Sequence, residues 1–578
     1  MSKIIATRMN KILPRVLTSS QLCTRKPRTI LTGVTEIISV MEHVRVKNLS
    51  AYLLSLDAYK AFDKANTNLS LIILERMGFG PTFTGWIKAM HKDVGTRFIL
   101  GEISERLALP LSLRQGDNVA MPLFLLNMEP LLLRLKKNLK GIQVGPAEVK
   151  DEAYVDDIQI VSCDTEDLHT ADQICKEFED ISGMVLSREK TKILGFGGWE
   201  GRQDWPLPWA KAVDEMKAFG VNFKATLAET TTASWDACLK GIRKCMHGWS
   251  MRSMCTLKQR VFIATTYGLS KLWYLAQVLQ TPERVTSEVE KLCRQYLWKG
   301  RLEHLPWEEL VADREEGGLS FPHLRSKCDA LFLRNINKGL QDEKTRKHLS
   351  FWLGISLRDV VPDLRGGRSA EALTPYFRQA VSLVREEFQY GLNENAKSRQ
   401  IYRAFTTTPP VPRILTTRNL PWDLVFERCW NKVLTVEQQD VLYTVVSNVY
   451  PTKERLHRLN QHPTGNCGPC RVTETREHAF LHCPRFRHIW TYLKGEYPDT
   501  LTSTIGGGLD DSWILLAYRK DNRDTEKTFL VAATMEFIHQ QRKEESTNNI
   551  NVHVDIVHQF KGHIQACLRH HRALSIQL

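Results

Sequence analysis

The chain has 578 residues, and its hydrophobic content of 42% is enough for sizeable cores in several domains. Its formal net charge of +14 favours a polyanionic partner, with nucleic acid first and an anionic membrane surface second. The sequence has neither an apolar run of about 18 residues nor an apolar segment after Met1, which argues against a membrane span and a secretory signal. The 13 scattered cysteines are odd in number and indicate reduced thiols in an intracellular protein.

The first 100 residues contain a short apolar run that ends at an acid. Tyr52–Leu56 is too short for a helix and predicts a buried strand. Asp57 would stand at the C-terminal end of this strand, where α/β folds place ligands. Residues 66–68 are suited to cap a helix over 69–77, and a second helix is predicted near 83–94.

The next segment contains a glycine where backbone freedom matters. Arg114-Gln115-Gly116-Asp117 precedes a predicted helix over 118–137, which is rich in leucine and methionine. Gly116 can adopt a backbone conformation that other residues avoid, and it allows a ligand to approach closely.

The stretch Ala153-Tyr154-Val155-Asp156-Asp157-Ile158 predicts a β-hairpin with two acids at its tip. Adjacent carboxylates repel one another unless a cation bridges them, and Mg²⁺ takes carboxylate ligands beside substrate phosphates. The pair therefore suggests a metal site for phosphoryl chemistry. For an Asp-Asp pair taken alone, a solvated turn is the more frequent structure. A helix is predicted over 166–181 after this hairpin.

Residues 225–350 are predicted to be helical, including one helix near 257–279, another near 287–298, and aromatic stripes along their faces. Such stripes are more often core than base-stacking platforms. The basic residues interleaved with them are better candidates for contacting a nucleic-acid backbone. They are Lys240, Arg243, Lys244 and Arg252.

A second cluster, Cys467-x2-Cys470-x7-His478-x4-Cys483, has ligand types and spacing suited to zinc. A closed Cys₃His set is a structural site, because it leaves no position for water. His482 is a rival fourth ligand, and three reduced cysteines in a small core are the alternative to a metal site. The nearby basic residues suggest that this module grips RNA or target DNA; they are Arg476, Arg485, Arg487 and His488.

Three blocks in order carry a resemblance to a known family: Leu56-Asp57-x-x-Lys60-Ala61-Phe62-Asp63, Arg114-Gln115-Gly116, and Ala153-Tyr154-Val155-Asp156-Asp157. Together they resemble the reverse transcriptase domain of LINE-type (non-LTR) retrotransposons. The resemblance implies an α+β right-hand polymerase followed by a helical region and a small zinc-binding C-terminal module. We expect fingers and palm at 1–223, thumb and connection at 224–350, a helical region and linker at 351–412, the zinc module at 413–500, and a segment without an assigned role at 501–578.

The resemblance also implies roles for individual residues. Asp57 and Asp156 would bridge two Mg²⁺ ions, and Asp157 would complete the site. Phe62 would stand against the sugar of the incoming nucleotide and exclude a 2′-hydroxyl, although without the family it would be taken for an ordinary core aromatic. The remaining substrate-binding residues would contact nucleotide, template or triphosphate; they are Gln115, Gly116, Lys190 and Arg28.

The activity implied is RNA-directed DNA polymerisation, in which a DNA primer or target is extended with dNTPs on an RNA template. We expect an intracellular protein that works in the nucleus, with the cytoplasm as the other compartment, and no membrane partner. The chain departs from the family at residues 117–121 and at Val155, and it begins inside the fingers without the usual N-terminal endonuclease. The alternative is therefore a truncated remnant of an element that binds nucleic acid without catalysis.

Overall fold

The computed structural model describes residues 1–23, 28–92, 95–108, 113–114, 116–251, 256–299, 305–361, 363–364, 373–406, 419–501, 511–547 and 556–575. The chain forms two compact units. The first unit comprises residues 1–240, 272–282 and 325–405, and the second comprises residues 241–271, 283–324 and 406–578. Within the described ranges, every helix is too short or too polar to cross a bilayer.

The first unit is built on a five-stranded sheet with the order β11-β10-β1-β9-β8. Its strands are β11 (Lys211–Ala212), β10 (Lys192–Gly197), β1 (Ser50–Leu56), β9 (Asp157–Ser162) and β8 (Asp151–Tyr154). All neighbouring strands are antiparallel except β10 and β11. The predicted strand at 52–56 is thus the central strand, which explains its continuous burial.

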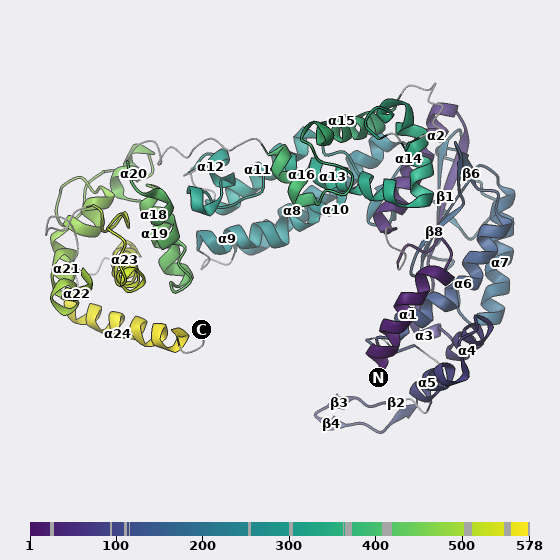
Figure 1. The fold of residues 1–578 in the computed structure, drawn as a ribbon, viewed down its shortest axis with the longest axis horizontal. Helices are drawn as coiled ribbons and strands as arrows, with labels where there is room; N and C mark the ends of the chain where they lie inside the picture. The colour runs from purple at the N-terminus through teal and green to yellow at the C-terminus, as the bar shows by residue number, and fades with distance from the viewer. Residues whose placement is uncertain are drawn as a thin grey trace. The chain divides into compact units, whose positions relative to one another are not determined.

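Helices cover both faces of this sheet, with α6 (Ala120–Asn138) and α7 (Glu166–Ser182) on one side and α2 (Ile30–Lys47) and α14 (Glu343–Leu357) on the other (Figure 1). Alternate residues of β1, including Tyr52 and Leu54, belong to the core that α6 and α7 line. The predicted helices at 118–137 and 166–181 are confirmed within two residues at each end.

Two further helices of the first unit follow β1. They are α4 (Thr67–Arg76) and α5 (Pro81–His91). The Asn66 side chain caps α4 by accepting hydrogen bonds from the amides of Asn68 and Leu69, as the sequence predicted.

Residues 224–350, expected to form a single thumb and connection, contribute to both units. Helix α8 (Leu227–Ser250) continues across the boundary at Lys240. The helix expected over 257–279 is interrupted: α9 (Leu257–Ile263) is followed by a π-helical turn (Ala264–Gly268) and then by α10 (Ser270–Ala276). A Cβ atom on Gly268 would lie 2.4 Å from the end of the flexible Met246 side chain, which would have to move aside for a larger residue.

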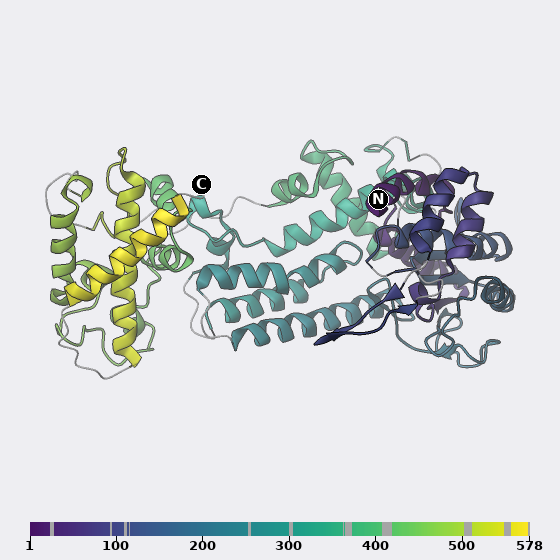
Figure 2. The ribbon, with the colours of Figure 1, turned by 90° about the horizontal axis from the view of Figure 1, so that it is seen from below.

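The second unit packs α18 (Trp422–Cys429), α19 (Val436–Val446), α21 (Pro484–Glu496) and α23 (Asp524–Thr547) around a common core. Helix α24 (Ile556–Ser575) crosses α23, as Figure 2 shows. The linker expected at 406–412 lies outside the described residues except for Thr406.

Candidate active site and metal centre

The strand register brings Asp57 next to the acidic hairpin. Leu56 of β1 is paired with Ile158 of β9, so the next antiparallel pair in the same register is Asp57 and Asp157. Asp156 immediately precedes Asp157 in the turn between β8 and β9. Asp57 is about a hundred positions from Asp156 and Asp157 in the sequence, yet the three carboxylates gather at one end of the sheet, as predicted.

The turn of this hairpin contains Val155 and Asp156, because Tyr154 pairs with Asp157 across it. The tip is therefore shifted by one residue from the expected Asp-Asp pair. Val155 has a φ of 62°, a left-handed conformation that is strained for a β-branched residue. The buried Gln21 side chain holds this residue: its Oε1 accepts a hydrogen bond from the Val155 amide at 3.1 Å, and its Nε2 lies 3.5 Å from the Val155 carbonyl oxygen.

The acids of the site favour a bound cation. Burial, followed by the charge of Asp57, raises the pKa of Asp156. Burial raises the pKa of Asp157 to about 6, and repulsion from Asp156 and Asp57 acts in the same direction. Half-buried carboxylates that repel one another are a donor set suited to divalent magnesium, which takes oxygen ligands.

Two neighbours orient Asp157. The amide of Gln159 donates a hydrogen bond to the Asp157 carboxylate and another, of 3.0 Å, to the Ser55 hydroxyl. The backbone amide of Phe219 also donates to the Asp157 carboxylate. Phe219 and Gly220 both have positive φ and form the turn between β12 (Met216–Ala218) and β13 (Val221–Phe223). Nothing in the local sequence indicates that the Phe219 amide reaches the acids.

Lys190 is the cation nearest to the acids among the pairs found in the described part of the chain. Its Nζ lies 3.3 Å from Asp57 Oδ2, and its side chain is 63% exposed. Because the pair faces solvent, it adds little to stability and leaves the ammonium free to meet an anionic ligand.

Two other predicted substrate-binding residues, Phe62 and Gly116, have described surroundings. Phe62 is half-buried, and its ring stacks on Phe124 with centroids 4.6 Å apart. Gly116 has a φ of 87°, and among the described residues no atom lies within 4 Å of the place that a Cβ would take. A side chain there would strain the backbone without meeting a neighbour. Gln115 lies outside the described residues.

Arg28, expected to hold triphosphate or template, is instead buried at 2% exposure. Its Nη1 lies 2.8 Å from Glu36 Oε1 and 3.1 Å from Asp342 Oδ2, and its Nη2 lies 2.6 Å from Glu152 Oε2. Lys344 also pairs with Glu36 and Glu152. The expectation is corrected because three carboxylates pair with the guanidinium inside the protein, where a nucleotide cannot reach it.

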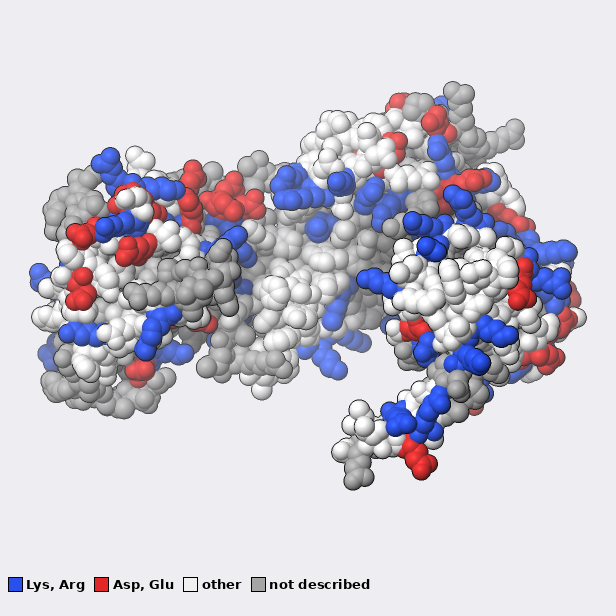
Figure 3. All heavy atoms as spheres, turned by 60° about the horizontal axis from the view of Figure 1, so that its bottom comes forward, with Lys and Arg blue, Asp and Glu red and all other residues white. Residues whose placement is uncertain are grey.

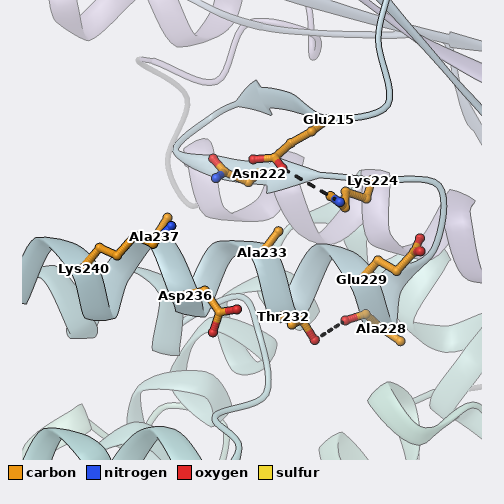
Figure 4. Close-up of a pocket in the computed structure, with 10 residues that line it drawn as sticks. All are labelled: Glu215, Asn222, Lys224, Ala228, Glu229, Thr232, Ala233, Asp236, Ala237 and Lys240. Carbon is orange, nitrogen blue, oxygen red and sulfur yellow. Dashed lines mark hydrogen bonds and ion pairs between the residues drawn. The ribbon is translucent and has the colours of Figure 1, made fainter.

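The basic residues predicted along α8 are solvent-exposed where they are described, namely Lys240, Arg243 and Lys244. Lys240 lines a pocket of about 530 Å³ between α8 and the β12–β13 hairpin, together with the acids Glu215 and Glu229 (Figure 4). Arg243 is paired with Glu288 at 2.7 Å. Arg252 lies outside the described residues. The face in Figure 3 shows Lys and Arg interspersed with Asp and Glu, so this face is not uniformly basic.

Four residues of the second unit converge as the sequence predicted. Ligand atoms of Cys467, Cys470, His478 and Cys483 all lie within 4.8 Å of one another. The Sγ atoms of Cys470 and Cys483 are 3.6 Å apart. A tetrahedral zinc ion with bonds of about 2.3 Å would separate two thiolates by roughly 3.8 Å. The cluster therefore has the dimensions of a closed zinc site.

The surroundings of this cluster also fit a cation. His478 Nε2 is buried without a hydrogen-bond partner among the described residues, and coordination would satisfy it. Burial raises the pKa of the Cys467 and Cys483 thiols, so three thiolates would need a compensating charge. His482 is 54% exposed and lies beside Asp511, which removes it as the rival ligand.

Arg476, expected to contact nucleic acid beside the zinc ligands, is instead buried. It is 7% exposed, and its Nη1 donates a hydrogen bond to the Val445 carbonyl at 3.0 Å. Arg487 and His488 are exposed and keep the predicted accessibility.

Comparison with known proteins adds independent findings. Residues 1–223 match the family of reverse transcriptases (RNA-dependent DNA polymerases), and residues 410–490 match the family of zinc-binding modules in reverse transcriptases. The chain is 25% identical over 358 residues to the transposon TX1 uncharacterized 149 kDa protein of Xenopus laevis, covering 59% of this chain and 26% of that protein. It is 24% identical over 355 residues to the retrovirus-related Pol polyprotein of the type-2 retrotransposable element R2DM of Drosophila melanogaster, covering 58% of this chain and 33% of the relative.

The chain thus spans about a quarter to a third of the length of these two relatives. Among solved structures, the apo telomerase of Candida tropicalis aligns with 70% of this chain and 60% of its own at 9% identity, with a TM-score of 0.31 that is too low to support an argument. The sheet with its acidic hairpin and the two family matches agree on a right-hand polymerase fold with a C-terminal zinc-binding module. The findings therefore support a non-LTR reverse transcriptase: residues 1–223 match the reverse transcriptase family, and the chain is similar to proteins of the TX1 and R2 elements.

Proposed function

We propose that this chain is an RNA-directed DNA polymerase, which extends a primer 3′-hydroxyl with dNTPs on an RNA template and releases pyrophosphate. The observation that carries the proposal is the convergence of Asp57, Asp156 and Asp157 at one end of the sheet. The raised pKa values of Asp156 and Asp157 support a site whose negative charge is balanced by bound cations.

The three carboxylates would hold two Mg²⁺ ions, which when bound activate the primer hydroxyl and stabilise the triphosphate. Gln159 and the Phe219 amide keep the Asp157 carboxylate in place by hydrogen bonds. Lys190, beside Asp57 and exposed, would bind the triphosphate as a point charge. Phe62 would select the sugar, and the open space at Gly116 would let the nucleotide approach the backbone.

Primer extension on an RNA template tests the proposal. Full-length chain with Mg²⁺ and dNTPs should extend a labelled primer, and Asp156→Asn should abolish extension because it removes a shared metal ligand. Asp204→Asn is a matched control in the same unit, since the Asp204 side chain is 92% exposed beside Arg202. Extension that survives Asp156→Asn, or a wild-type chain that binds template and primer but never extends, would refute the proposal.

We also propose that the zinc-binding module contacts RNA or target DNA, because exposed Arg487 and His488 flank its ligands. Cys470→Ser should lower the zinc content and weaken binding to nucleic acid, while the first unit keeps its extension activity on a short primer. Because a chromosomal DNA target lies in the nucleus, we also propose that the chain acts there.

Binding in this proposal follows phosphate contacts, so affinity for an RNA–DNA duplex should fall steeply with salt. Six or more contacts would give a loss of roughly a thousandfold between about 50 and 200 mM. Affinity that ignores salt would argue against a phosphate-tracking surface.

A further inference from the structure

A second group of metal-ligating side chains lies on the two C-terminal helices, outside both family matches. Glu536 belongs to α23, and His563 and Cys567 belong to α24. Their ligand atoms all lie within 4.8 Å of one another. No role in the proposed polymerase reaction involves these residues.

The measured separations match a tetrahedral ion. Cys567 Sγ lies 3.5 Å from His563 Nε2, and Glu536 Oε2 lies 3.8 Å from the same nitrogen. Zinc bonds of about 2.3 Å to a thiolate and about 2.1 Å to an imidazole would separate the two atoms by roughly 3.6 Å. A carboxylate oxygen at about 2.0 Å would lie roughly 3.4 Å from the nitrogen. The side chains therefore need only small movements to surround an ion.

The backbone presents the three groups from a rigid frame. His563 and Cys567 are four residues apart on α24, which places them on the same face of the helix. Phe560 and Ile564 of this helix are buried at 0% and 2% exposure, so the rotation of α24 is fixed by packing. The His563 ring also lies against Phe537 of α23, with centroids 5.4 Å apart.

Two outer contacts orient the ligand atoms. The Gln438 amide donates a hydrogen bond of 2.9 Å to Glu536 Oε2. The His563 ring donates to the backbone carbonyl of Ala533, while Nε2 faces Glu536 and Cys567. Carbonyl and amide partners of this kind are typical around metal-bound histidines and carboxylates, where they hold the ligand in its binding orientation.

We propose that Glu536, His563 and Cys567 bind a second Zn²⁺ that links α24 to α23, with water or a further ligand in the fourth position. The thiolate and imidazole select zinc over magnesium or calcium, which take oxygen ligands. The site is separate from the Cys₃His cluster, and it gives the C-terminal helix a metal-dependent attachment to the second unit.

Zinc stoichiometry of the full chain tests this proposal. The purified protein is loaded with Zn²⁺, dialysed against a weak competing chelator, and analysed for zinc by mass spectrometry. We expect two ions per wild-type chain, one in Cys567→Ser, one in Cys470→Ser and none in the double variant. His570→Ala is a matched control on an exposed turn of α24 and should keep both ions. One ion per wild-type chain, lost in Cys470→Ser and unaffected by Cys567→Ser, would overturn the proposal.

A second variant covers the case in which Cys567→Ser fails to fold. Glu536→Gln keeps the size of the side chain and a carbonyl oxygen that accepts from Gln438, so the helix packing should survive. It should release one of the two ions at a lower chelator concentration, with unchanged helical circular dichroism. Cobalt substitution gives a further readout, because the thiolate-to-cobalt absorption that remains in Cys470→Ser should disappear when Cys567→Ser is added. A folded Glu536→Gln chain that releases zinc as the wild type does would contradict the assignment.

Discussion

Replacement of Arg28 with alanine is expected to destabilise the first unit, because it removes the central counter-charge of a buried ion cluster. Among the described residues, the cluster contains two cations, Arg28 and Lys344, and three carboxylates, Glu36, Glu152 and Asp342. Burial raises the pKa of Glu152 to about 8. Burial acts in the same direction on Glu36, but the charges of Arg28 and Lys344 outweigh it and hold the pKa of Glu36 below its usual range.

Without Arg28, one lysine would face two buried carboxylates. The Arg28, Glu36 and Glu152 side chains are at most 1% exposed, so solvent screens the lost charge very little. Breaking a buried pair by removing one partner costs about 3–5 kcal/mol. Arg45→Ala is a matched control on α2, the helix that follows Arg28, because Arg45 is 53% exposed in its pair with Glu42. A surface pair of that kind contributes less than about 1 kcal/mol.

Denaturant unfolding followed by circular dichroism measures the difference, with steady-state extension as the second assay. We expect Arg28→Ala to lower the free energy of unfolding of the first unit by about 3–5 kcal/mol, and Arg45→Ala to lower it by less than about 1 kcal/mol. At a temperature where both variants are folded, the KM for dNTPs should be close to that of the wild type. An Arg28→Ala chain of wild-type stability with a strongly raised KM would refute the structural role and restore the nucleotide contact expected from the sequence.

Three further predictions concern the proposed active site. The rate of primer extension should fall below about pH 6, because burial raises the pKa of Asp157 to about 6 and a proton on this carboxylate competes with the metal ion. The acidic limb of the pH–rate profile should move to lower pH at higher Mg²⁺ concentration. A profile that does not depend on Mg²⁺ would contradict this prediction. Gln21→Ala should lower kcat by roughly a hundredfold while the protein stays folded, since the strained turn at Val155 loses its hydrogen bonds. Unchanged single-turnover rates would show that the turn keeps its conformation without Gln21. Phe62→Val should admit ribonucleotides while dNTP use persists, as scored by alkali-sensitive products, and unchanged discrimination would leave Phe62 as a partner of Phe124 alone.

Local chemistry in the sequence determined much of the fold and the identity of the main site residues. The run at 52–56 is a buried strand because four of its five residues are apolar or aromatic and lie in the core. Asn66 caps α4 because its side chain bonds amides two and three residues away. The spacing of the zinc ligands predicted their convergence, since all four lie within 17 residues of chain, from Cys467 to Cys483. These features depend on neighbours in the sequence, which periodicity and spacing describe.

Tertiary structure alone decided the features that depend on distant partners. Arg28 resembles a surface cation until residues 342–344 bring Asp342 and Lys344 to it across more than 300 positions. The same holds for Gln21, whose partner Val155 is 134 residues away. The burial of a charged group is set by what packs over it, and no pattern within a local window records that packing.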